Sequence, residues 1–141
     1  QFTSSGGMID YSRDTLGVAS DRVYQFAVIK KNAEGYLQTI IEKPSAEEIA
    51  LCTNEHGRVG VSMNLFRFFY DRILPALESV PINPVRYEKE LPSAVCLMLE
   101  SYPEEMAVLE FDEAVPDLTN KDDITKIRDL IKRTYPVSLW K

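Results

Sequence analysis

Histidine and cysteine are scarce in this chain, and their scarcity argues against two classes of active site. The 141 residues include one histidine and two cysteines. A zinc site needs several His or Cys ligands, and nucleophilic catalysis of the Ser-His or Cys-His kind needs a histidine beside its nucleophile. His56 lies in a Glu-His-Gly turn with no nucleophile motif beside it. The sequence therefore predicts neither a zinc centre nor nucleophilic catalysis of this kind.

The two cysteines form no recognisable pattern. Cys52 and Cys96 are far apart, and each falls in an expected helix without the spacing of a metal site or a disulfide framework. We expect both to be reduced, mostly buried thiols in a cytoplasmic protein. The first residues lack a basic region followed by an apolar one, so no secretory signal is expected.

Long apolar runs and an excess of positive charge are also missing. No apolar run approaches the roughly 20 residues that a membrane span needs. The formal net charge of -6 argues against a nonspecific nucleic-acid or anionic membrane surface, because binding to phosphate backbones needs clustered Lys and Arg. The sequence thus predicts no membrane and no nucleic-acid partner, while a local basic site could still bind a small anion.

Apolar periodicity predicts strands that alternate with helices, and therefore an α/β fold with a mixed sheet and flanking helices. Residues 1–17 are small, polar and glycine-bearing, and we expect a flexible lead-in there, followed by one domain over residues 18–141. A hairpin over residues 23–42 would supply an antiparallel pair. The expected strands cover residues 23–29, 35–42, 58–68 and 107–111, and the expected helices cover residues 46–52, 69–80, 91–99 and 122–134.

One of these strands ends in an acid, a base and a proline. Pro44 cannot donate to a strand ladder and favours an extended Lys43, so the strand should stop after Glu42. Ligands of α/β sheets bind at the carboxyl ends of strands. A carboxylate beside an ammonium group could bind sugar hydroxyls and a phosphate, and the alternative is an exposed ion pair.

Further polar residues follow other expected strands or precede helices: Asn64, Glu88 or Glu90, and Asp117. A lone carboxylate such as Asp117 can hold Mg²⁺ when water and substrate phosphates complete the shell, and the alternative is a turn or capping acid. Glycine inside a strand often marks a close approach of the backbone, which we expect at Gly60 or Asn64. The chain contains no glycine-rich phosphate loop of the Walker or dinucleotide type.

Four motifs, in order, resemble the pattern of sugar-1-phosphate nucleotidyltransferases such as the glucose-1-phosphate adenylyl-, thymidylyl- and uridylyltransferases. The first is the hairpin that ends in Glu-Lys-Pro, and the second is similar to the family's Ser-Met-Gly-Ile-Tyr-Val-Phe strand. The third resembles its Glu-x-x-Leu-Thr-Asp-Ala-Ile helix start, and the fourth its Ala-Trp-x-Asp-x-Gly-Thr turn. The matching segments are Phe26–Pro44, Ser62–Phe68, Glu88–Val95 and Ala114–Asn120.

The resemblance implies a Rossmann-like nucleotidyltransferase fold and an enzyme that joins a nucleoside triphosphate to a sugar 1-phosphate, giving a nucleotide sugar and pyrophosphate. Carried over to this chain, Glu42 would bind sugar hydroxyls, Lys43 the sugar phosphate and Asp117 a magnesium ion. Such a reaction needs positioning and charge neutralisation more than covalent catalysis.

The departures from the family pattern define what this chain could be. Asn64 replaces a glycine, Val115 a tryptophan, Ser93 an aspartate, and Thr119-Asn120 replaces Gly-Thr. The family's glycine-rich nucleotide-binding half is missing, so the chain resembles the C-terminal, sugar-binding half and should be inactive alone.

Two other interpretations stay open. The first is a non-catalytic sugar-phosphate-binding or assembly module of the same fold, and the second is an unrelated α/β domain. If the chain is one half of an enzyme, its partner is the missing N-terminal half. The surface that faces that half would then be exposed apolar area or strand edge, which swapping or dimerisation could cover.

Overall fold

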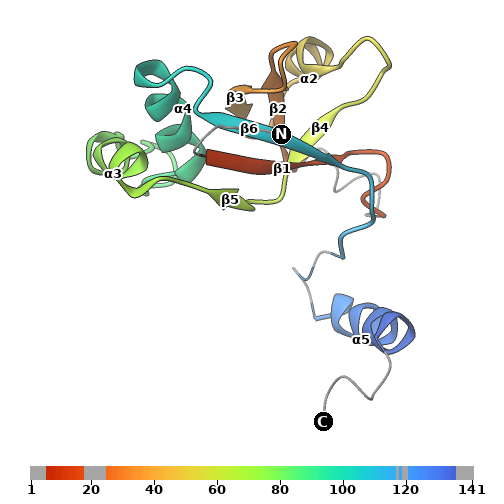
Figure 1. Ribbon diagram of the computed structural model, residues 1–141. Helices are drawn as coiled ribbons and strands as arrows, with labels where there is room; N and C mark the ends of the chain where they lie inside the picture. The colour runs from red at the N-terminus through yellow and green to blue at the C-terminus, as the bar shows by residue number, and fades with distance from the viewer. Residues whose placement is uncertain (1–5, 18–24, 117, 119–120, 136–141) are drawn as a thin grey trace.

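The computed structural model describes residues 6–17, 25–116, 118 and 121–135. These residues form an α/β fold with a mixed, open sheet of six strands and with four helices (Figure 1). The alternation predicted from the sequence is therefore confirmed at this level. The strands are β1 (Gly6–Ser12), β2 (Ala27–Lys31), β3 (Leu37–Ile41), β4 (Gly60–Ser62), β5 (Phe66–Arg67) and β6 (Met106–Phe111), and the helices are α2 (Ala46–Cys52), α3 (Tyr70–Ser79), α4 (Leu91–Ser101) and α5 (Asp123–Thr134).

Strand β1 lies at the centre of the sheet. It pairs antiparallel with β4 and β5 along one edge and parallel with β6 along the other. The expectation of a flexible lead-in over residues 1–17 is therefore wrong for residues 6–12. Glycines at its start give β1 little strand propensity, and its pairing with three other strands is what makes it a strand.

The expected hairpin is formed by β2 and β3, which pair antiparallel with Ile29 opposite Ile40. Gly35, at a φ of 85°, turns the chain between them. The next residue, Tyr36, forms a bridge with Ala107, and the Val108 N–H donates to the Gly35 carbonyl at 2.8 Å. This contact joins the β2–β3 hairpin to β6. The sheet is therefore curved, so that β3 approaches β6.

The strand expected over residues 58–68 is interrupted. Tyr11 pairs with Val61 and Met8 with Phe66, so the four residues between Val61 and Phe66 face only two residues of β1. Asn64 takes up the extra length at a φ of 58°, in the left-handed region that asparagine tolerates. The segment is therefore two strands, β4 and β5, joined by a bulge.

Helix α2 begins at a local capping signal. Ser45 and Glu48 form a capping box at the start of α2, with the Glu48 N–H donating to Ser45 Oγ at 3.2 Å and the Ser45 N–H to the Glu48 carboxylate at 2.8 Å. The Ser45 backbone and side-chain hydrogen bonds lower the pKa of Glu48.

None of the described helices has both the length and the apolar character needed to cross a bilayer.

Two apolar cores occupy the two faces of the sheet. The first core packs α3 and α4 against the face that carries Met8, Ile29 and Val108. The second core lies on the opposite face, around Tyr11 and Val61, where Ile49 and Cys52 of α2 partly cover it. Figure 1 shows α3 and α4 together at one end of the sheet, and α2 beside β2 and β3.

Replacement of Gly60 by alanine should destabilise this sheet. A Cβ atom at Gly60 would lie 2.7 Å from the carboxyl carbon of Asp10, which confirms the expected close approach. Because ion pairs hold that carboxylate in place, we expect Gly60→Ala to lower the free energy of unfolding by about 1 to 3 kcal/mol. Urea denaturation followed by circular dichroism measures this. Gly7→Ala is the control, since its Cβ would meet the Ala107 oxygen at an ordinary 3.5 Å, and equal stabilities of the two variants would contradict the explanation.

Candidate functional site

The end of β3 and the start of α4 form one pocket of about 420 Å³, here called the rim pocket. Glu42 follows the last residue of β3, and Glu90 directly precedes the first residue of α4. The structure thus brings together two of the carboxylates singled out in the sequence. The pocket is lined by Ile40, Glu42, Val80, Pro81, Glu90, Pro92, Ser93, Cys96, Leu97 and Glu100.

Glu90 is fixed in its position at the rim pocket. Its side chain is 12% exposed, and its two oxygens accept hydrogen bonds from different residues. Arg86 Nη1 lies 2.9 Å from Oε1, and Asn83 Nδ2 donates to Oε2 at 2.8 Å. A carboxylate held at both oxygens loses little further side-chain freedom when a ligand binds.

Glu42 has no hydrogen-bond or ion-pair partner among the described residues, and it is half-buried at the pocket. The adjacent Lys43 is exposed at a φ of 47°, in the left-handed region. The expectation that Pro44 would keep Lys43 extended is therefore wrong. Between the end of β3 at Ile41 and the start of α2 at Ala46 the chain must turn within four residues, and the backbone of Lys43 makes part of that turn.

The remaining predicted residues lie at different places. Ser62 pairs with Ala27, and Val28 pairs with Ile41, so the carboxyl ends of β3 and β4 lie at the same rim of the sheet. Asn64 is exposed two residues beyond that end of β4. Glu88 is exposed, 4.0 Å from Arg86, and does not line the rim pocket.

Asp117, the expected magnesium ligand, lies outside the described residues. Within the part of the chain that the structure describes, no group of three or more His, Cys, Asp or Glu side chains is arranged to hold a metal ion. The described residues on their own therefore do not make a magnesium site.

Sequence reasoning did not single out Glu100, which lines the rim pocket with Ser93 and Cys96. The signal was helical periodicity, because residues 93, 96 and 100 fall on one face of α4. Cys96 is a free, half-buried thiol, with its Sγ 3.6 Å from Thr39 Oγ1. The described residues that line this pocket include three carboxylates and no Lys or Arg, so it suits groups that donate hydrogen bonds, such as hydroxyls.

A second polar cluster, here called the charged network, surrounds the carboxylate of Asp10, which is fully buried in β1. Asp10 Oδ2 accepts from Lys31 Nζ at 2.9 Å and from Arg58 Nη1 at 2.6 Å, and Arg58 Nη2 donates to the Asp10 carbonyl at 2.9 Å. Glu110 pairs with Lys31, and Asp112 lies 3.3 Å from Arg58 Nε. Asp10 Oδ1 has no partner among the described residues and lies against Gly60.

The charges of the network act on one another. Burial lowers the pKa of the Arg58 guanidinium, but the hydrogen bond and negative charge of Asp10, with Glu110 and Asp112, outweigh burial and raise it. The hydrogen bond from Lys31 lowers the pKa of Glu110 despite partial burial. A polar pocket of about 190 Å³ adjoins the network near Cys52, whose pKa is raised by burial. Because the cations are already neutralised, we assign the network a structural role.

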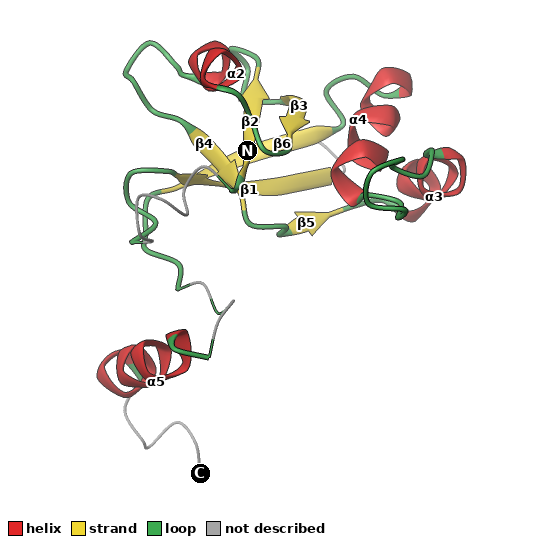
Figure 2. Cartoon of the chain, turned by 180° about the vertical axis from the view of Figure 1, so that it is seen from behind, coloured by secondary structure: helices red, strands yellow, loops and turns green. Residues whose placement is uncertain are grey.

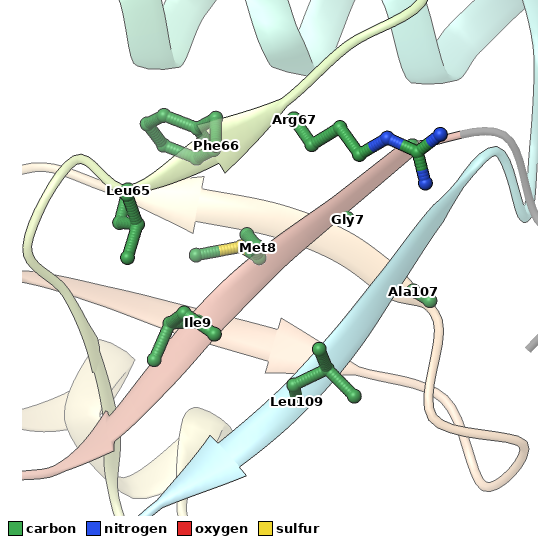
Figure 3. A pocket seen from close by; sticks show the side chains of 9 residues that line it. Gly7, Met8, Ile9, Leu65, Phe66, Arg67, Ala107 and Leu109 are labelled. Carbon is green, nitrogen blue, oxygen red and sulfur yellow. The ribbon is translucent and has the colours of Figure 1, made fainter.

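A third feature is an apolar groove of about 420 Å³ on the face of the sheet that carries Ile9 (Figure 3). Its lining comes from β1, from β6 and from the segment around β5, with Ile9, Leu65 and Leu109 directed into it. Leu65 is 55% exposed and Leu109 46% exposed. Among the described residues that line the groove, Arg67 alone is charged.

Loss of the buried charge of Asp10 should lower the free energy of unfolding more than loss of an exposed charge. In Asp10→Asn, Lys31 and Arg58 keep their charges and lose a buried counter-ion, and we expect stability to fall by about 3 to 5 kcal/mol. Asp14→Asn is the matched control, because Asp14 is exposed and pairs with Arg13 alone among the described residues, so its loss should stay below about 1 kcal/mol. Chemical denaturation of both variants checks this, and a similar small loss in each would refute the structural role.

The pKa of Glu110 gives the network a pH dependence. Because its pKa is lowered in the folded state, its contribution to stability is present above the unfolded value of 4.5 and is lost as the pH falls through the folded value. Glu110→Gln should therefore be less stable than the parent at neutral pH, and the difference should vanish at acidic pH. Thermal melts across this range measure it, and a difference independent of pH would argue against the ion pair.

Comparison of the chain with models of known protein families gives no match, and comparison with characterised proteins finds none that is significantly similar. The candidate site thus stands on the motifs and the geometry described above.

Proposed function

We propose that this chain is the C-terminal, sugar-phosphate-binding part of a sugar-1-phosphate nucleotidyltransferase with a Rossmann-like fold. The observation that carries the proposal is that Glu42 and Glu90 line one pocket, although they are 48 positions apart and come from two different motifs of the resemblance. The Asn64 bulge, from a third motif, follows the end of β4 at the same rim of the sheet.

The residues at this rim suit the recognition of a sugar phosphate. Glu90, held by Asn83 and Arg86, is a fixed acceptor for sugar hydroxyls, and Glu42 is an acceptor with no partner of its own among the described residues. The exposed ammonium of Lys43 follows directly and can neutralise the phosphate. A pocket of about 420 Å³ is of the size that small-ligand sites have.

The chemistry needs components beyond these residues. In the whole enzyme magnesium would supply charge neutralisation at the reacting phosphates, with Asp117 as one ligand, and an N-terminal half would bind the nucleoside triphosphate. The chain alone is accordingly expected to bind the sugar phosphate without turnover. The alternative, a non-catalytic sugar-phosphate-binding module, is favoured by the replacement of Gly-Thr by Thr119-Asn120 after Asp117.

Isothermal titration calorimetry with glucose 1-phosphate as the probe tests the proposal. Glu42→Gln and Lys43→Ala should each weaken binding by roughly tenfold or more, because a hydrogen bond to a charged group is worth about 1.5 to 3 kcal/mol. Glu47→Gln is the control, since Glu47 is exposed in the first turn of α2 and does not line the rim pocket.

The outcomes separate the two interpretations. Binding that the two site variants weaken and the control leaves unchanged supports the rim pocket as the sugar-phosphate site. Binding that magnesium strengthens, and that Asp117→Ala makes insensitive to magnesium, favours the enzyme half. Magnesium-independent binding favours the module. No binding of glucose, galactose or mannose 1-phosphate by the parent chain would overturn both.

A further inference from the structure

The apolar groove is the uncovered continuation of the second core. Ile9 contacts that core and also lines the groove, so the apolar surface is continuous along β1. At the Tyr11 end, α2 and Val115 pack on it. At the other end, Gly7 and Ala107 carry little or no side chain. The groove is therefore a depression between Leu65, Leu109 and Arg67 (Figure 3). Exposed apolar surface of this kind marks an interaction site.

Helix α5 has the complementary surface. Ile124, Ile127, Leu130 and Ile131 form an apolar stripe along it, yet the only buried residue of the helix is Asp123. A helix of 12 residues is marginal in water unless its apolar face packs on something. It also carries four cations and two acids, a net charge of +2 in a chain whose net charge is -6, so the rest of the chain carries -8. The apolar stripe therefore matches the apolar groove, and the opposite net charges favour association with the body of such a chain, although Arg67, the charged residue that lines the groove, has the same sign as the helix.

The structure holds α5 away from its own groove. Asp112 pairs with Arg58, and Val115 packs in the second core, so the segment after β6 is anchored at the end of that core opposite the groove. Both views show α5 standing apart from the sheet (Figures 1 and 2). Each chain therefore presents an exposed groove together with a helix whose apolar stripe is mostly exposed.

We propose that two copies of this chain exchange their C-terminal helices, so that α5 of each copy lies in the apolar groove of the other. The contact is isologous, because the same helix and the same groove are used twice around a two-fold axis. Exchange of an identical element between protomers is a low-cost route to a dimer. The proposal concerns a surface separate from the rim pocket and does not depend on sugar binding.

Light scattering after size-exclusion chromatography, across a dilution series of the 141-residue chain, tests the dimer. The parent should give the mass of two chains, and Ile127→Asp should give the mass of one, because it places a charge in the apolar stripe. Thr125→Asp, exposed on the opposite side of α5, should remain dimeric. Circular dichroism confirms that each variant keeps its fold. A monomeric parent, or an Ile127→Asp variant that stays dimeric, would overturn the proposal.

Crosslinking identifies the occupant of the groove. Leu109→Cys is made in one chain and Ile127→Cys in another chain of different mass, each with Cys52 and Cys96 replaced by serine. A short bismaleimide should join the two different chains after mixing. If the double variant instead crosslinks within single chains at high dilution, α5 occupies the groove of its own chain and the exchange is refuted. Should no crosslink form in either arrangement, the groove is not the α5 site and the proposal also fails.

Discussion

The buried charge of Asp10 is the constraint on which the rest of this sheet depends. A carboxylate without solvent must have cations beside it, and these come from the end of β2 and from the segment that leads into β4. The same carboxylate requires a residue without a side chain at Gly60. One charge thus fixes how β1, β2 and β4 align, and Glu110 extends the arrangement to β6. Apolar pairing alone would specify this register less strictly, because a slip of two residues would still present apolar side chains to the core.

The charged network and the rim pocket show how similar residues can serve different roles. In the network, every carboxylate faces a cation, so little capacity is left for a ligand. At the rim pocket, Glu90 pairs with Arg86 and accepts from Asn83, while Glu42 has no partner among the described residues, and none of the described lining residues is a cation. Glu42, an acceptor without a counter-ion among the described residues, beside a carboxylate that is held in place, suits a ligand that carries several hydroxyl groups. This contrast is the physical reason for placing the candidate function at the rim.

Local signals predicted the elements that local interactions form. The spacing of Ser45 and Glu48 predicted the start of α2, and apolar periodicity predicted α3, α4, α5 and β6 to within a few residues. Strand β1 was missed because its strand character comes from partners about 50 to 100 residues away. The network was missed for the same reason, since Lys31 and Arg58 are 21 and 48 positions from Asp10, and Gly60 was the one local hint. The choice between Glu88 and Glu90 could not be made from the sequence, because it depends on how Asn83 folds the preceding loop.

The loop over residues 80–90 is held by polar contacts of Asn83 and Lys89. The Asn83 side chain accepts from the backbone N–H groups of Val85 and Arg86 and donates to Glu90, while Lys89 Nζ binds the Leu77 and Glu78 carbonyls at the end of α3. A segment with neither helix nor strand is therefore joined at both ends to helices. A protease cuts extended, movable chain, and this loop offers such chain only after its polar contacts break. One wall of the rim pocket thus behaves as part of the α3 to α4 unit, and the pocket keeps its shape while it is empty.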